Sequence, residues 1–319
     1  MKTHTRNMYV FVLFSMAIIF EFYAQTSTNQ KAILVTGASS GIGLKITEVL
    51  SSKGYFVYAG ARKQEDLDRL NAMKNVQSIQ LDVNNWDEIN AAVETVKTGN
   101  RGLYGLVNNA GVAILAPLIE VEEDELDYIF NVNIYGPYRI TKAFAPLIIE
   151  SKGRIATISS ISGILSGSFF GPYSMSKHAM EAFTDALADE MKKFGVSVSA
   201  IEPGNYNSKI SETFYNRLKA QGFKYDNSLY KKEWEGLMAG FTPDRSRYKN
   251  PDEVAAAVEK ALFSENPKRR YMVVPREEEG QWTITQIMRE MAQLNENQAY
   301  KYDREALIKI LDQVLAETE

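Results

Sequence analysis

The chain has 319 residues, of which 45% are hydrophobic and 24% charged, the composition of an ordinary globular protein with a sizeable core. Its net charge of −4 argues against a nucleic-acid-binding surface, which normally carries an excess of positive charge. The lack of cysteine excludes disulfides and thiolate catalysis, and with only two histidines we expect no metal site. No Pro/Gly/Ser-rich linker or internal repeat interrupts the chain, which favours a single domain.

Residues 1–28 are predicted to lie outside the folded domain, which we place at residues 29–319. Lys2 and Arg6 precede an apolar run from Met8 to Phe20, the order found in a secretory signal. The run is shorter than the about 20 apolar residues of a membrane span, and the expected cleavage region is poor in small residues. The segment is therefore an export signal, an uncleaved anchor that contacts a membrane through residues 8–24, or the product of a start codon placed too far upstream.

From Asn29 onward, short apolar strands alternate with amphipathic helices, a pattern typical of a doubly wound α/β fold whose parallel sheet is covered on both faces. Ligands bind such sheets beyond the carboxyl ends of the strands. We predict seven strands: Ala32 to Thr36, Phe56 to Ala59, Ser78 to Asp82, Gly105 to Asn108, Arg154 to Ile158, Ser197 to Ile201 and Arg270 to Val274.

A glycine-rich turn follows the first strand and opens a helix from Leu44 to Ser52. Glycines permit a tight turn and let the diphosphate of a dinucleotide approach backbone amides at the helix N-terminus, where the partial positive charge favours anions. The alternative, a glycine-rich loop without a ligand, is disfavoured by the position between strand and helix. The turn reads Thr36-Gly37-Ala38-Ser39-Ser40-Gly41-Ile42-Gly43.

Ser160, Tyr173 and Lys177 form the strongest catalytic pattern. The apolar strand from Arg154 to Ile158 ends just before Ser160, and Pro172, suited to a first helical position, precedes Tyr173. Tyr173 and Lys177 are four residues apart, so they share one helix face. Two further pairs have this spacing without this context: Tyr138 with Lys142, and Tyr215 with Lys219.

These motifs resemble those of the short-chain dehydrogenase/reductase family over residues 31–275. The resemblance implies an NAD(P)-dependent oxidoreductase that transfers hydride between a nicotinamide and a secondary alcohol or ketone. Gly105 to Gly111, Ile201 to Asn205 and Arg270-Tyr271 look most like the branch of retinol, steroid and 3-hydroxybutyrate dehydrogenases. The family's motifs occur in order: Thr36 to Gly43, Asn108-Asn109-Ala110-Gly111, Asn133, Ser160, Tyr173-x-x-x-Lys177 and Pro203-Gly204.

By this resemblance, Tyr173 is the general acid in ketone reduction and the general base in alcohol oxidation. An ammonium at about 4 Å, here Lys177, is worth roughly 4 kcal/mol, enough to lower a tyrosine pKa from about 10 toward neutral. Lys177 would also bind the nicotinamide ribose, and Ser160 would hold the substrate oxygen. Asn133, within a predicted helix from Glu123 to Glu150, would hold a water that relays protons, or else serve only the structure.

The resemblance also implies which residues bind the cofactor. Asp82 would meet the adenine ring, and Asn108 to Gly111 would mainly stabilise the sheet. NADP(H) is favoured because no acidic residue follows the second strand before Glu65, whereas Arg62 can engage a 2′-phosphate. NAD(H) is the alternative, with Arg62 stacked on the adenine. The expected cofactor-binding residues are Gly37, Ser39, Ser40, Gly41, Ile42, Gly43, Arg62, Asp82, Val83, Asn109, Tyr173, Lys177, Pro203 and Gly204.

Residues 205–250, here called the lid segment, are irregular and hold nine aromatic residues. In the family this segment forms a mobile lid over the substrate. Its nine Lys/Arg against five Asp/Glu either attract an acidic substrate or form a solvated basic helix face. Two helices are expected after it, Gln281 to Leu294 and Asp303 to Ala316, as packing or interface elements.

Two other functions stay open: a catalytically silent nucleotide-binding sensor, and a dehydratase or epimerase on the same scaffold. The intact set of catalytic residues argues against the sensor. The resemblance further implies a homodimer or homotetramer formed through helices around Asp124 to Ile149 and Pro172 to Phe194. Because reduced nicotinamide cofactors are normally available in the cytoplasm, we expect a cytoplasmic protein, with membrane association through the N-terminus or export as alternatives. We expect no nucleic-acid partner.

Overall fold

The computed structural model describes residues 30–240, 242 and 244–318, so the expectations for residues 1–28 lie outside the described residues. A seven-stranded, wholly parallel sheet has the order β3-β2-β1-β4-β5-β6-β7, which confirms the doubly wound fold. The order reverses between β1 and β4, where such sheets bind ligands. The strands are β1 (Ala32–Val35), β2 (Phe56–Ala61), β3 (Val76–Gln80), β4 (Gly105–Asn108), β5 (Arg154–Ile158), β6 (Ser197–Pro203) and β7 (Arg270–Val273).

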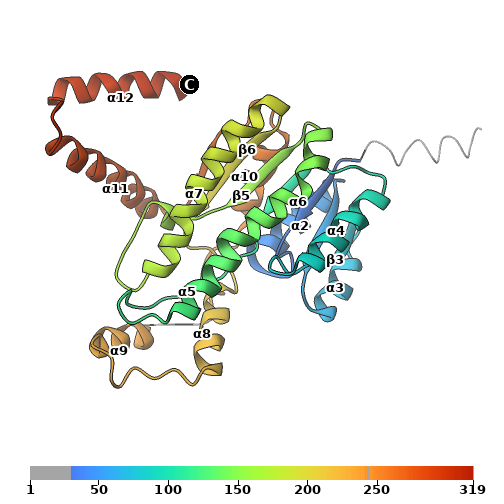
Figure 1. Ribbon diagram of the computed structural model, residues 1–319, viewed down its shortest axis with the longest axis horizontal. Coiled ribbons are helices and arrows are strands. Elements are labelled where there is room, and N and C mark those ends of the chain that lie inside the picture. The colour runs from blue at the N-terminus through green and yellow to red at the C-terminus, as the bar shows by residue number, and fades with distance from the viewer. Residues whose placement is uncertain (1–29, 241, 243, 319) are drawn as a thin grey trace, which may run out of the picture.

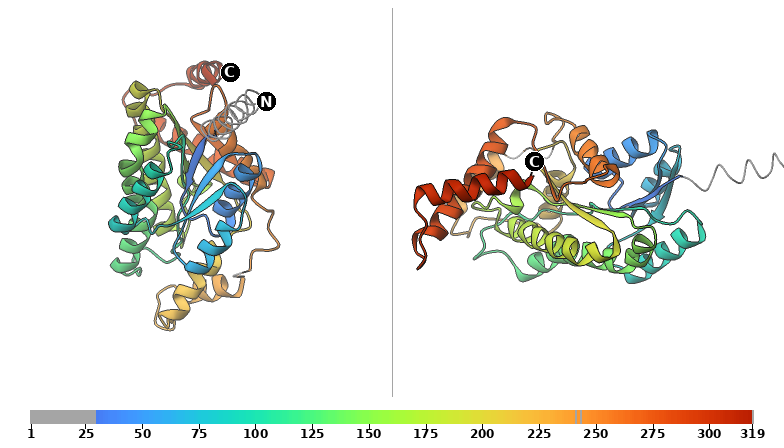
Figure 2. Two further views of the ribbon diagram at one scale, coloured as in Figure 1. Left: turned by 90° about the vertical axis from the view of Figure 1, so that its right-hand side faces the viewer. Right: turned by 90° about the horizontal axis from the view of Figure 1, so that it is seen from above.

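Helices cover both faces of the sheet, as the two views of Figure 2 show. All four residues of β1 are buried, and alternate side chains enter opposite layers because successive residues of a strand point to opposite faces. Ala32 and Leu34 join the core beneath α4 (Trp86–Thr98), α6 (Gly136–Glu150) and α7 (Gly171–Met191). Ile33 and Val35 join the core on the other face, beneath α2 (Gly41–Ser52), α3 (Gln64–Asn71) and α10 (Asp252–Phe263).

The single helix expected from Glu123 to Glu150 is wrong in one respect. The structure has α5 (Glu123–Phe130), a π-helical stretch η1 (Asn131–Tyr135) and then α6. π-helical turns inside α-helices are frequently found at functional sites, and this one carries Asn133. Because helix propensity concerns single residues, no sequence pattern predicts this change in winding.

The strand expected at Ser78 to Asp82 lies two residues earlier, so Asp82 follows β3 rather than ending it. Beyond β6, the helices α8 (Ile210–Ala220) and α9 (Lys231–Gly240) lie together at one end of the molecule (Figure 1). The expected C-terminal helices are present and longer, α11 (Glu277–Glu296) and α12 (Arg304–Thr318), and they extend away from the sheet. Among the described residues, no helix combines the length and apolar character needed to cross a bilayer.

Candidate active site

One cavity of about 1010 Å³ opens at the carboxyl ends of the strands. Every residue predicted for catalysis or cofactor binding lines it except Asn133. Neither of the two other tyrosine/lysine pairs is among the lining residues. Tyr138 and Lys142 lie on the surface of α6, with 3.4 Å between the lysine Nζ and the tyrosine hydroxyl. The structure thus separates Tyr173 and Lys177 from the pairs of equal spacing.

The glycine-rich turn forms one wall of the cavity and is held by β4. Asn109 Nδ2 donates to the carbonyl oxygens of Thr36 (2.9 Å) and Gly37 (3.1 Å). Gly37 has φ +65°, and a Cβ there would stand 2.9 Å from the Ala110 Cα. A Cβ on Gly43 would overlap Gly37 O and the Asn109 amide. Glycine is therefore required by geometry, and the expected structural role of the stretch from Asn108 to Gly111 is visible in these hydrogen bonds.

Arg62 and Asp82 lie at another part of the cavity wall, where β2 and β3 end. The Arg62 side chain is 63% exposed, and its Nη1 lies 3.7 Å from Asp82 Oδ2, a loose ion pair. Nearby, Arg69 of α3 donates to Ser39 O at 2.6 Å and so ties the glycine-rich turn to α3. The sequence pattern did not single out Arg69, because its contact depends on how α3 packs.

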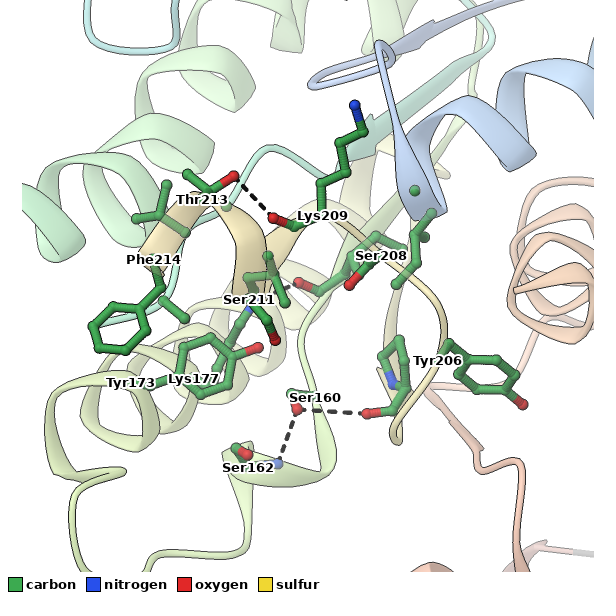
Figure 3. Close-up of a pocket in the computed structure, with 18 of the residues that line it drawn as sticks. Ser160, Ser162, Tyr173, Lys177, Tyr206, Ser208, Lys209, Ser211, Thr213 and Phe214 are labelled. Carbon is green, nitrogen blue, oxygen red and sulfur yellow. Dashed lines mark hydrogen bonds between the residues drawn. The ribbon is translucent and has the colours of Figure 1, made fainter. Parts of the chain in front are cut away.

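Ser160, Tyr173 and Lys177 meet at the remaining end of the cavity (Figure 3). Ser160 Oγ donates to Pro203 O at a long 3.4 Å and accepts the Ser162 amide at 3.1 Å. Lys177 Nζ donates to Ile158 O at 3.0 Å and lies 5.7 Å from the centre of the Tyr173 ring. The end of β5 thus delivers the serine and α7 the Tyr/Lys pair, as the sequence predicted.

Burial dominates the electrostatics of this pair. It raises the pKa of Tyr173, and the interactions with the Ser160 side chain and with the charge of Arg245 only partly oppose it. Burial also lowers the pKa of Lys177 to about 8, against the charge of Glu181 one turn further along α7. The expected lowering of the tyrosine pKa toward neutral is therefore not seen here: burial outweighs the groups that lower it, and the Lys177 ammonium donates to the Ile158 carbonyl.

Asn133 is buried outside the cavity lining, and its side chain makes structural hydrogen bonds. Its Oδ1 accepts the Val112 amide at 2.9 Å, and its Nδ2 donates to Val112 O (3.0 Å) and Ser176 Oγ (2.9 Å). Ser176 Oγ in turn donates to Tyr173 O at 2.7 Å. The amide group thus ties the loop after β4 to the first turn of α7, and both of its donor hydrogens are used.

Ser208 and Trp282 line the cavity, although neither was predicted from the sequence as a site residue. Ser208 packs against the glycine-rich turn, since a Cβ on Gly41 would stand 3.1 Å from its Cβ. Lys209 points away from Tyr173 and Ser160 (Figure 3). Trp282 of α11 lines the cavity, and the fully buried Glu279 accepts the Asn205 amide at 2.8 Å. α11 therefore contacts the turn after β6, beyond the packing or interface role expected for it.

Two buried carboxylates, Glu181 and Glu202, form an acidic group near Lys177. Glu181 of α7 and Glu202 of β6 are both buried, and each has carboxylate oxygens without a hydrogen bond among the described residues. Arg270 of β7 bridges them, 3.3 Å from Glu181 Oε2 and 3.2 Å from Glu202 Oε1. Burial, and then the charge of Glu181, raise the pKa of Glu202 to about 8. This acidic group lies outside the cavity lining.

A doubly wound sheet with a glycine-rich turn beside its switch point is the arrangement of a dinucleotide-binding enzyme. The profile of the short chain dehydrogenase family matches residues 31–218. The chain is 36% identical to the mitochondrial D-beta-hydroxybutyrate dehydrogenase of Mus musculus over 243 residues, 73% of this chain and 68% of that protein.

Two further comparisons agree. An NADPH-dependent 3-dehydrocapnine reductase of Ornithobacterium rhinotracheale is 33% identical over 252 residues, 76% of this chain and 88% of that protein. A short-chain dehydrogenase structure from Streptomyces avermitilis matches with a TM-score of 0.71 at 30% identity, over 85% of this chain and 96% of that one. The chain therefore belongs to the short-chain dehydrogenase family. It is an NAD(P)-dependent oxidoreductase of the alcohol dehydrogenase and carbonyl reductase class.

Proposed function

We propose that the enzyme interconverts a ketone and a secondary alcohol, with Tyr173 as the proton donor and acceptor. The observation that carries this proposal is that Ser160, Tyr173 and Lys177 share one cavity with the glycine-rich turn. A bound nicotinamide cofactor would supply or accept the hydride. The residues present fit such a group, because the turn is built from glycines that admit no side chain and it ends at the N-terminus of α2.

The buried tyrosine is suited to ketone reduction. Its raised pKa keeps the phenol protonated at neutral pH, so Tyr173 can donate a proton to a substrate oxygen on which negative charge develops. Ser160 Oγ, held by the long bond to Pro203 O, can turn to donate to the same oxygen. Alcohol oxidation needs the tyrosinate instead, so its rate should rise with pH.

Lys177 acts on the tyrosine from one helical turn away. With a pKa of about 8 it is mostly an ammonium at neutral pH, and its charge would stabilise the tyrosinate left after proton donation. The hydrogen bond to Ile158 O fixes its direction. Asn133 would support this arrangement by fixing the first turn of α7 through Ser176.

NADP(H) is the proposed cofactor. The exposed guanidinium of Arg62 and its loose pairing with Asp82 leave it able to engage a 2′-phosphate. Lys209 and the turn around Ser208 would close over the diphosphate, since they pack against Gly41. Residues 205–250 would act as the lid over the substrate, because many of their side chains line the cavity.

Assembly and location extend the proposal. Tyr135, Tyr138 and Met175 expose apolar surface on η1, α6 and α7, where a second copy would pack in a dimer or tetramer. Light scattering checks this, and a strictly monomeric active enzyme would contradict it.

We propose a cytoplasmic enzyme, and fractionation of cells tests this location. A chain beginning at Asn29 tests whether residues 1–28 are needed for activity.

Turnover of a panel of ketones and alcohols with each cofactor tests the function itself. The Tyr173→Phe variant should lose on the order of 100- to 10,000-fold in kcat, the usual contribution of a general acid, while still binding cofactor. Tyr138→Phe is the matched control and should keep its turnover. Wild-type turnover in Tyr173→Phe would overturn the mechanism.

A further inference from the structure

Arg245 in the lid segment is a half-buried cation whose side chain is fixed by neutral partners. Its Nε donates to Tyr206 O at 3.1 Å and its Nη1 donates to Ser211 Oγ at 3.2 Å. The guanidinium also lies over the Tyr248 ring, 4.0 Å from its centre. No hydrogen bond from Nη2 occurs within the described ranges, so part of the planar donor group is left for a further partner, and Arg245 lines the cavity.

The charge of Arg245 has no direct acidic partner: the buried carboxylate of Glu279 acts on it, but that carboxylate is paired with Arg276 at 2.9 Å. Among residues 30–240, 242 and 244–318 it forms no ion pair, whereas Arg217 pairs with Glu125 at 2.6 Å and Arg270 pairs with Asp185 at 2.7 Å. Burial lowers the pKa of Arg245, which shows that desolvation of the charged form is not fully compensated. Placing a cation away from water is costly unless an opposite charge meets it, so a bound anion would be favoured here.

Arg245 also acts on the reaction centre. Its charge interacts electrostatically with Tyr173, and the two residues line the same cavity. Lys209, the other lid cation considered above, points away from Tyr173 (Figure 3). An anion held by Arg245 would therefore lie on the substrate side of the cavity, beside the carbonyl that Tyr173 protonates.

We propose that the substrate carries an anionic group, a carboxylate or a sulfonate, close to the reacting carbonyl, and that Arg245 binds this group. The inference rests on the proposed function and names its substrate class, an oxo acid reduced to a hydroxy acid. A guanidinium is suited to the task because its coplanar N–H groups match the two oxygens of such an anion. The aromatic rings of Tyr248 and Trp282 would enclose the rest of the molecule.

The test compares substrates that differ only in charge, using the full chain with NADPH. The pairs are a 3-oxo acid and its methyl ester at short and long chain length, with 2-oxopropane-1-sulfonate to separate sulfonate from carboxylate. Wild type should have the higher kcat/KM for the acid. Arg245→Gln should lower the acid-to-ester ratio by roughly 10- to 150-fold, the value of a charged hydrogen bond, mainly through KM.

Three controls keep the result specific. Arg245→Lys should retain part of the preference, because it keeps the charge. Lys224→Gln removes one positive charge from the lid segment at an exposed residue outside the cavity lining, and its ratio should match wild type. The affinity for NADPH should be unchanged in Arg245→Gln; a weakened affinity would assign Arg245 to the cofactor and overturn the proposal.

Inhibition of wild type provides a measurement that does not depend on the variants folding. An unreactive alkanoate should compete with the oxo acid more strongly than the amide of equal length. Equal inhibition, or a wild-type preference for esters, would overturn the role of Arg245 while leaving ketone reduction intact. Absence of turnover with every ketone and alcohol would instead refute the proposed function.

Discussion

The glycine-rich turn at residues 36–43 and the lid segment line the same cavity, but different kinds of contact hold them. The turn is held through its own backbone: the Asn109 side chain donates to two of its carbonyl oxygens, and the Arg69 side chain donates to a third. In the lid segment, α8 is attached to the rest of the protein by a pair of side chains, Arg217 and Glu125 of α5, at 2.6 Å. Geometry thus restricts residue type in the turn, whereas the contact that attaches α8 depends on the charge of two side chains.

The aromatic cluster of the lid segment illustrates the second case. Trp234 of α9 is 2% exposed, and its ring lies 4.8 Å from that of Phe169 and 4.9 Å from that of Phe223. These rings pack against each other and against the loop before α7, apart from the two cores of the sheet. The comparison suggests that cofactor choice lies with the turn and its neighbours, and substrate choice with the lid segment. Three of the four experiments below can break or sharpen this division, and the other concerns the buried acidic group of Glu181 and Glu202.

The largest effect is expected from Gly43→Ala. The added Cβ would overlap Gly37 O and the Asn109 amide, and overpacking of 1 to 3 kcal/mol corresponds to a loss of cofactor affinity on the order of 100-fold. Gly236→Ala in α9 is the matched change, since nothing lies within 4 Å of its Cβ. Fluorescence titration with NADPH measures both variants. Wild-type affinity in Gly43→Ala would show that the turn is not the cofactor site.

A smaller effect is expected from Arg62→Ala. The Arg62 guanidinium is exposed and part of its charge is already neutralised by the ion pair with Asp82, so its contribution should be at the lower end for a charged hydrogen bond. Its loss should lower the ratio of kcat/KM for NADPH over that for NADH by roughly 10-fold. Lys63→Ala removes the adjacent exposed charge and should leave the ratio unchanged. An unchanged ratio in Arg62→Ala removes that residue from cofactor selection, and a wild-type preference for NADH refutes the cofactor assignment.

The acidic group near Lys177 should make stability depend on pH. Since the pKa of Glu202 is raised from 4.5 to about 8, the folded protein binds a proton that the unfolded chain releases. The free energy of unfolding should therefore fall as pH rises through this window.

Glu202→Gln mimics the protonated carboxyl and should flatten that dependence. Between about pH 5 and pH 8 the Tm of wild type should fall by about 2 °C or more relative to the variant. Glu94→Gln, an exposed change on α4, should behave as wild type. Parallel curves for wild type and Glu202→Gln would show that Glu202 is ionised throughout the range.

The smallest effect is expected from Glu125→Gln, which weakens the attachment of the lid segment. The hydrogen bonds from Arg217 hold the pKa of Glu125 below its usual range, so the pair is ionised at neutral pH. Its loss should raise the substrate KM by about 3-fold, as for a partly exposed ion pair, and leave the affinity for NADPH unchanged. Weaker NADPH binding in this variant would contradict the division between turn and lid segment.

The sequence by itself determined the doubly wound sheet. Strands that are buried on both faces, such as β1, consist of continuous apolar residues, and these runs alternate with amphipathic helices along the chain. It also determined the glycine-rich turn and the grouping of Ser160 with Tyr173 and Lys177. Each of these depends on contacts within a few residues, or on the rule that parallel strands end at one edge.

Only the tertiary structure decided the rest. The placing of Arg245 beside Tyr173 and of Glu279 against the turn after β6 joins segments about 70 residues apart, and no local pattern encodes such contacts. The π-helical turn at Asn133 is also absent from any local pattern, and it is followed by a close approach of α6 to Val83, since a Cβ on Gly136 would stand 2.7 Å from that side chain. The raised pKa of Tyr173 has the same origin: spacing placed the lysine one turn away, but burial, a property of the whole fold, decided the direction of the change.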